Sequence, residues 1–194
     1  MKKRTNLARS VAVVFSMTLI SSACYATCTL SNATVTDNTT CFQAVGTAAS
    51  GASWTSGNLE VTSSGAITGD LNGLATTGPV NNLINAGTIT TTSTDWRKYA
   101  IYLGYSVNSL QNSGSIVNQV GKGILVNDTI NTIENTGTID AVRFGIYNGN
   151  NIGSIFNSGV ITSAFSGITN DLTTIGTITN VGVISSITNI GGTI

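Results

Sequence analysis

Short apolar segments alternate with polar bends along most of the chain. From about residue 61 onward, apolar residues stand two or three positions apart, and Gly, Asn or Ser interrupts them every six to eight residues. β-branched side chains predominate among the apolar residues, and no stretch keeps the 3.6-residue spacing of an amphipathic helix. The pattern therefore predicts short β-strands joined by tight turns.

This pattern recurs at a nearly constant step. The motif Asn-x-Gly-x-Ile occurs five times, and its glycines follow one another at 27, 23, 22 and 23 residues. Three further apolar tracks advance by a similar step, so that the registers move together, as expected of a structural repeat. The motif spans residues 85–89, 112–116, 135–139, 157–161 and 180–184, and the tracks are Ile101, Ile124, Ile146, Ile168; Val107, Ile130, Ile152, Ile175; and Leu110, Ile133, Ile155, Ile178.

The length of the repeat restricts the fold. Leucine-rich repeats carry several Leu per unit and propeller blades need about forty residues, so neither fits. We therefore predict an all-β protein in which residues 61–194 form a right-handed parallel β-helix of about six coils of 22–23 residues. The Ile and Val tracks would then stack as columns inside the coils.

Two polar features of the repeat follow from this fold. The repeated glycines are expected where the chain bends with a positive φ or where a side chain has no room. Equivalent asparagines at one bend are expected to bond from coil to coil as a ladder, formed by Asn112, Asn135, Asn157 and Asn180.

The amino-terminal residues 1–26 have the layout of a secretory signal peptide. A basic segment precedes an apolar segment of ten residues and a small-residue segment that ends at Ala26, and this apolar stretch is too short to span a membrane, which needs about 20 residues. An alternative is lipidation of Cys24. Export favours oxidation, so we expect residues 27–60 to form a cap closed by a Cys28–Cys41 disulfide.

Charge is sparse, and the chemistry available is limited. Only 8% of the residues are charged, and with Lys2, Lys3, Arg4 and Arg9 left out the balance is 4 − 8 = −4. A mildly acidic body argues against nucleic-acid binding. The absence of His excludes Ser-His-Asp catalysis and His-ligated metals, so we expect no metal and no cofactor.

The remaining acids are not expected to form a catalytic pair. Aligned by the repeat, Glu134 shares a column with Gln111 and Phe156, and Asp140 shares one with Val117 and Thr162. Glycoside hydrolysis needs two carboxylates about 5–9.5 Å apart, whereas Asp128 and Asp171 would lie two coils apart. The sequence therefore favours a protein that is not an enzyme.

One coil is longer than the others, and it holds the candidate ligand contacts. The extra residues fall near 91–99, and insertions in solenoids often carry binding. Aromatic and cationic residues coincide there: Trp96, Arg97, Lys98, Tyr99 and Tyr102. They could stack on sugar rings or anchor a protein contact. The alternative is ordinary packing, with Tyr99 over Phe144 in the next coil and Tyr102 stacked with Tyr147.

The Asn-[Ser/Thr]-Gly-x-Ile repeat, a Gly-Ile element about eight residues later and a Cys pair behind a signal segment resemble the amino-terminal part of a bacterial autotransporter passenger. The resemblance covers residues 61–194. It implies an adhesin-like rod without catalysis at the cell surface, and a carboxy-terminal outer-membrane barrel in a full-length relative. The expected partner is a host-cell protein or glycan.

Other interpretations stay open beside this one. A chain that ended at Ile194, before such a barrel, would stop in the periplasm. The same architecture also occurs in secreted carbohydrate-active enzymes. A third alternative is a spacer or scaffold that self-associates through its open solenoid end, where strand edges are unpaired.

Overall fold

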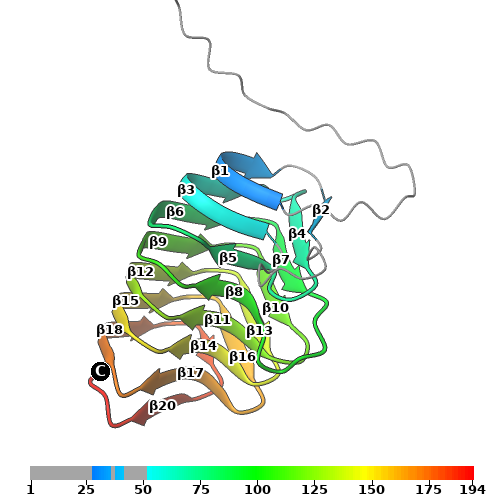
Figure 1. Ribbon diagram of the computed structural model, residues 1–194. Coiled ribbons are helices and arrows are strands. Elements are labelled where there is room, and N and C mark those ends of the chain that lie inside the picture. The colour runs from blue at the N-terminus through cyan, green and yellow to red at the C-terminus, as the bar shows by residue number, and fades with distance from the viewer. Residues whose placement is uncertain (1–27, 36–37, 42–51) are drawn as a thin grey trace, which may run out of the picture.

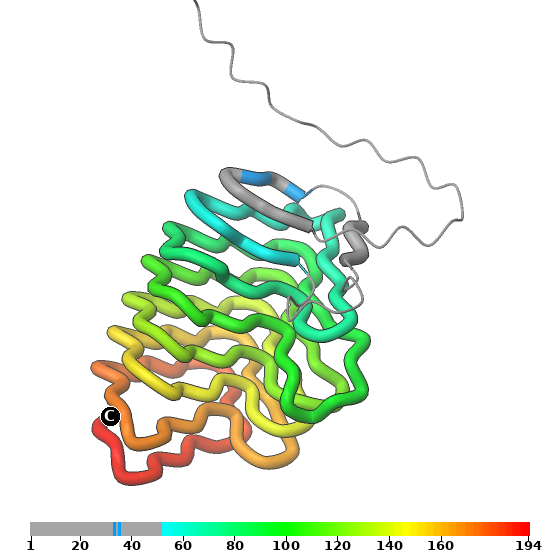
Figure 2. The backbone as a smooth tube through the Cα atoms, in the orientation of Figure 1, coloured from blue at the N-terminus to red at the C-terminus, as the bar shows by residue number. Residues whose placement is uncertain are grey.

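The computed structural model describes residues 28–35, 38–41 and 52–194. In these residues the chain is all β, and parallel strands stack as a solenoid of about six turns. Successive coils lie one below another from β1 to β20, as Figure 1 and Figure 2 show. The predicted parallel β-helix of about six coils is therefore confirmed.

The strands form three faces that run the length of the solenoid. One sheet contains β2 (Asn38–Cys41), β4 (Ala66–Gly69), β7 (Thr88–Thr91), β10 (Ser115–Asn118), β13 (Thr138–Ala141), β16 (Val160–Ser163) and β19 (Val183–Ile184). The second face contains β5 (Leu74–Thr76), β8 (Tyr99–Leu103), β11 (Lys122–Val126), β14 (Phe144–Asn148), β17 (Ser166–Asp171) and β20 (Ile187–Ile190). The third contains β6 (Val80–Asn85), β9 (Val107–Asn112), β12 (Thr129–Asn135), β15 (Asn151–Asn157) and β18 (Thr174–Asn180).

The second and third faces meet in one long strand. β3 (Ala52–Val61) pairs with β5 through its first residues and with β6 through its last. β1 (Cys28–Val35) pairs with β3 in parallel, so part of the segment predicted as a cap continues the stacking. The predicted signal segment 1–26 and Cys24 lie outside the described residues, as do the side chains of Cys28 and Cys41.

The apolar tracks stack inside the coils in the predicted register. Ile124 pairs with Ile101 on one side and with Ile146 on the other, and Ile146 pairs with Ile168. All four of these side chains are fully buried. Each contributes about 1.5–3 kcal/mol through burial, so the columns are the main source of stability.

The glycine of the Asn-x-Gly-x-Ile motif is required because the coils approach closely there. None of these glycines has a positive φ; among the described glycines only Gly57 and Gly191 do. A Cβ on Gly137 would lie 2.2 Å from the carbonyl oxygen of Gly114, and one on Gly159 would lie 2.1 Å from that of Gly137. Of the two explanations that the sequence allowed, lack of space is therefore the one that applies.

The four predicted ladder asparagines lie in one column beside these glycines. Asn135 Nδ2 donates to Asn157 Oδ1 at 2.7 Å, and Asn112 Nδ2 donates to Asn135 Oδ1 at the same distance. Asn135 Nδ2 also lies 3.2 Å from the carbonyl oxygen of Val160 in the next coil. The ladder begins one coil earlier, at Asn85, whose Oδ1 has no partner because Val61 holds the position before it.

Removing a central ladder residue should destabilise the solenoid measurably. Asn135→Ala deletes a fully buried amide and leaves Asn112 Nδ2 and the carbonyl of Val160 with one partner fewer. The expected loss in the free energy of unfolding is about 1–3 kcal/mol. Asn131→Ala is the matched control, because Asn131 lies in an exposed row and donates only to Asn108 Oδ1. Urea titrations that gave both variants the same loss would show that the buried ladder adds nothing.

A second ladder, which the repeat did not predict, crosses the end of the second face. Asn148 Nδ2 donates to Asn170 Oδ1 at 2.8 Å, and Asn170 Nδ2 donates to Asn189 Oδ1 at 2.9 Å. In earlier coils the same column holds Leu103 and Val126. The column therefore changes from apolar to amide partway along the solenoid.

Candidate functional site

The longer coil places an ordered loop, residues 92–98, between β7 and β8. Its own side chains fix the loop: the backbone N–H of Asp95 donates to Ser93 Oγ, and that of Arg97 donates to Asp95 Oδ1. Asn118 from the next coil donates to the carbonyl of Lys98 at 2.9 Å. Such side-chain turns hold a loop in one conformation, and here they leave Trp96 48% exposed.

Beside this loop, aromatic and cationic side chains alternate along the outward face of β8, β11 and β14. The register pairs Tyr99 with Lys122 and Lys122 with Phe144, while Leu125 lies between Tyr102 and Tyr147. The alternative in which Tyr99 packs on Phe144 and Tyr102 on Tyr147 from adjacent coils is therefore wrong. Tyr99 and Phe144 lie two coils apart, as do Tyr102 and Tyr147.

Lys122 lies among three rings from the coils on either side of it. Its Nζ is 5.1 Å from the ring centroid of Tyr99, 4.9 Å from that of Tyr147 and 6.0 Å from that of Phe144. Tyr99 and Tyr102 stack within one strand, with their centroids 5.6 Å apart. A cation over aromatic faces gains about 0.5–2 kcal/mol, which helps to hold Lys122 in place.

Arg143 connects the loop to this row. Its Cζ lies 4.2 Å from the ring centroid of Trp96, 5.3 Å from that of Phe165 and 5.8 Å from that of Phe144. Trp96 thus reaches a residue two coils away because the insertion projects beyond its own coil. We call Trp96, Tyr99, Lys122, Arg143, Phe144, Tyr147 and Phe165 the aromatic–cation cluster.

Neither cation of the cluster forms an ion pair with a carboxylate in the part of the chain that the structure describes. Among the described residues the ion pair found is that of Arg97 with Asp95, at 3.8 Å and largely exposed. Arg143 Nε is buried without a hydrogen-bond partner. Burial lowers the pKa of Lys122, and the charge of Arg143 lowers it further. The cluster therefore holds the positive charges of Lys122 and Arg143 without a carboxylate beside them among the described residues.

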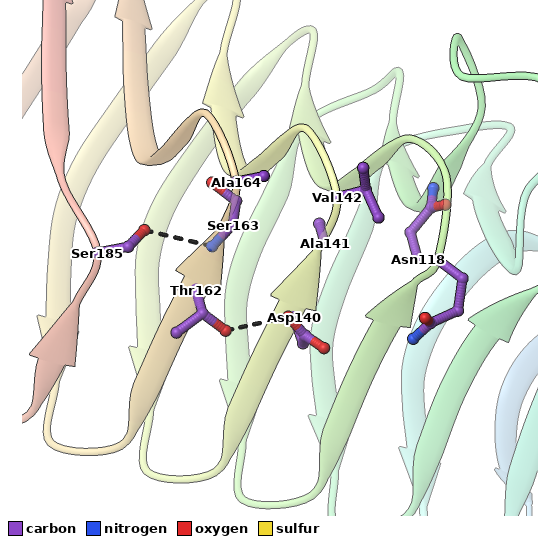
Figure 3. A pocket seen from close by; sticks show the side chains of 9 residues that line it. Asn118, Asp140, Ala141, Val142, Thr162, Ser163, Ala164 and Ser185 are labelled. Carbon is purple, nitrogen blue, oxygen red and sulfur yellow. Dashed lines mark hydrogen bonds between the residues drawn. The ribbon is translucent and has the colours of Figure 1, made fainter.

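A groove lies on the other side of the same corner. It has a volume of about 320 Å³ and is lined by residues of β10, β13, β16 and the turns after them. Figure 3 shows its side chains: Thr162 Oγ1 donates to Asp140 Oδ1 at 3.0 Å, and the N–H of Ser163 donates to Ser185 Oγ at 3.2 Å. Ser163 Oγ is buried without a partner. The groove ends at Val142 and Ala164, which directly precede Arg143 and Phe165 of the cluster.

The predicted contact residues are only partly brought together. Trp96 and Tyr99 belong to the cluster, Tyr102 stacks on Tyr99, and Arg97 lies over the exposed ring of Trp96 at 5.4 Å. Lys98 contributes its backbone carbonyl to Asn118. The cluster residues that the sequence analysis did not select for binding are Lys122, Arg143, Phe144, Tyr147 and Phe165. Adding the 22–23-residue step to Tyr99 would have found Lys122 and Phe144.

The carboxylates lie in separate places. Glu134 pairs with Gln111 and Phe156, as the alignment predicted, and Asp140 pairs with Val117 and Thr162. In the part of the chain that the structure describes, no three Cys, Asp or Glu side chains gather as a metal site. Nor do these residues include a helix that could cross a membrane.

The phenol of Tyr147 on this face has a strongly raised pKa. Its Oη donates a hydrogen bond to Asp171 Oδ2. Burial, followed by the hydrogen bond and the charge of Asp171, raises the pKa of Tyr147 from 10.0 to about 12. The folded state therefore favours the neutral phenol.

This shift predicts a pH dependence of stability. The stabilisation from Tyr147 is fully present below pH 10.0 and is lost as the pH rises to about 12, because the folded state holds the proton longer than the unfolded state. Tyr147→Phe lacks that contribution at every pH. The difference in the free energy of unfolding between the two proteins should therefore shrink across this window in urea titrations. A difference that stayed constant with pH would contradict the assignment.

Comparison with protein-family models, with curated proteins and with solved structures finds no match to this chain. The geometry of the cluster and groove is therefore the basis for a functional proposal. Both flank one corner of the solenoid, and both are built from residues of several successive coils.

Proposed function

We propose that this protein is a secreted or cell-surface rod without catalytic activity, which presents a binding surface at one corner of its solenoid. The aromatic–cation cluster is the observation that carries the proposal. Two cations without carboxylate partners lie among rings that are partly open to solvent, and the stacked coils hold all of them rigidly. Exposed aromatic and Arg side chains are the types that dominate binding energy at interfaces.

The architecture suits such a role. Each coil rests on the next through buried columns, so the corner keeps its shape along the rod. The sequence resemblance to an autotransporter passenger extends the proposal: the rod would be exported by a carboxy-terminal outer-membrane barrel in a full-length relative. The partner would be a protein or glycan of a host cell.

Export and binding can be tested separately. The chain is expressed in a Gram-negative bacterium, and mass spectrometry of the product in the periplasm is expected to give a mature chain that starts at Thr27. Val14→Arg, which places a charge in the apolar segment, is the control and should keep the chain unprocessed in the cytoplasm. Unprocessed wild type in the cytoplasm would contradict the proposed location.

Binding is tested with beads that carry the purified chain on cultured epithelial cells. The wild type is expected to adhere, and the double variant Trp96→Ala, Arg143→Gln is expected to lose most of that adhesion while keeping its urea midpoint. Equal adhesion by the two proteins would remove the cluster from the proposed function.

Self-association is a second candidate function, favoured by the last coil. Ile187 ends the central Ile column and is 48% exposed, and Val183 and Ile190 beside it are 54% and 49% exposed. Unpaired strand edges with apolar side chains can pair with another copy. The 194-residue chain is therefore expected to form assemblies in sedimentation velocity, and Ile187→Lys to reduce them. Phe156→Lys, at an exposed position on the third face, is the control. A monomeric wild type would exclude this function.

A further inference from the structure

Lys122 and Arg143, the two cations of the aromatic–cation cluster, both lie beside the ring of Phe144. Lys122 Nζ and Arg143 Cζ lie 6.0 Å and 5.8 Å from the same ring centroid, that of Phe144. Burial lowers the pKa of Lys122, and the positive charge of Arg143 lowers it further, because like charges without an acid beside them repel each other. Arg143 Nε has no hydrogen-bond partner. An anionic group bound between them would relieve the repulsion and supply an acceptor.

Two rings beside Arg143 are open to solvent. Trp96 is 48% exposed and Phe165 is 64% exposed, and the guanidinium of Arg143 lies over both rings. Large exposed rings on a rigid scaffold offer flat apolar faces on which another ring can stack. The C–H faces of a pyranose ring are apolar enough to take that position.

The groove on the other side of the corner offers polar groups. Asp140, Thr162, Ser163 and Ser185 present a carboxylate and hydroxyls, and Ser163 Oγ lacks a partner. Its volume of about 320 Å³ is at the lower end of the range for small-molecule sites, about 300–1,000 Å³. A ligand with many hydroxyl groups could both donate to Asp140 and pair with the serines.

We propose that this corner binds a saccharide that carries an anionic group, with the anion between Lys122 and Arg143, a sugar ring on Trp96 or Phe165, and neighbouring hydroxyls in the groove beside Asp140. The inference rests on the proposed function, because it names the ligand class of the same surface. A nucleic acid is disfavoured, since its affinity depends on many Lys and Arg side chains along its phosphates and the cluster contains two cations.

The test measures binding of the purified chain to polysaccharides with and without charged groups. Polygalacturonate and its fully methyl-esterified form share one backbone, and chondroitin sulfate supplies a sulfated arm. The charged polymers should bind the chain, and this binding should weaken with rising salt, whereas the ester should not bind. Binding to either charged polymer supports the proposal. Equal binding to the neutral ester, or equal binding to single-stranded DNA, would overturn it.

Variants locate the site. Arg143→Gln and Lys122→Gln should each weaken binding by about tenfold, because each removes one charge-assisted contact. Lys98→Gln is the matched control, since it removes a cation from the same corner without touching the cluster, and it should change binding by less than about twofold. Urea midpoints confirm that each variant is folded. If Lys98→Gln and Arg143→Gln lost the same binding affinity, the effect would come from net charge alone, and the proposed site would be contradicted.

The experiments distinguish failure of the saccharide inference from failure of the proposed function. A chain that is exported and adheres to cells but binds no charged saccharide would contradict this inference alone. A chain that binds polygalacturonate through Arg143 but stays unprocessed in the cytoplasm would contradict the proposed location and would still support the saccharide site.

Discussion

Replacing Ile146 by Asp is expected to unfold the solenoid. Ile146 is fully buried in the middle of its column, with Ile124 in the coil before it and Ile168 in the coil after it. The substitution removes about 1.5–3 kcal/mol of burial and adds the cost of a carboxyl group among apolar side chains, at least about 2 kcal/mol. A domain is stable by only about 5–15 kcal/mol, so the sum removes much or all of it.

The expected result is loss of the β-sheet circular dichroism signal and of a cooperative urea transition. Val181→Asp is the control, since Val181 is 74% exposed in a turn where the preceding coils hold Ser158 and Thr136. A charge at that position should cost no more than about 0.5 kcal/mol. Similar losses in the two variants would mean that the Ile column does not stabilise the fold.

The inward columns could be predicted because each coil repeats the same apolar choice. Every coil from β8 to β17 places Ile at the position of Ile124, so one step of 22–23 residues fixes the register of the whole face. The second asparagine ladder could not be found in this way. Its column begins with Leu103 and Val126 and only then changes to Asn148 and Asn170, so no single residue type marks it.

The candidate site was predicted less completely than the fold. The sequence pointed to Trp96 and Tyr99 because they lie in the longer coil, but their main partners come from later coils. Contacts such as that of Arg143 with Trp96 depend on how far the inserted loop projects, which its own hydrogen bonds decide. An insertion has no equivalent in the other coils, so the repeat says nothing about where it reaches.

Gly137→Ala is expected to produce the second large loss of stability. An added Cβ would lie 2.2 Å from the carbonyl oxygen of Gly114 and 2.6 Å from the carbonyl carbon of Ser113. Both are backbone atoms, and neither can move freely because the N–H of Thr138 donates to Gly114 O at 2.9 Å. The coils would have to separate locally and lengthen these bonds. We expect a loss of about 3 kcal/mol or more in the free energy of unfolding.

Gly149→Ala separates this clash from the general effect of replacing a glycine. Neither glycine has a positive φ, so both variants gain similarly from a less flexible unfolded chain. A Cβ on Gly149 would meet its nearest atom, Val126 O, at 3.2 Å, a contact that a small shift relieves. The expected change for Gly149→Ala is within about 1 kcal/mol in either direction. If urea titration gave Gly137→Ala the same small change, the coils could not be in contact at the glycine column, and the repeated glycines would need another explanation.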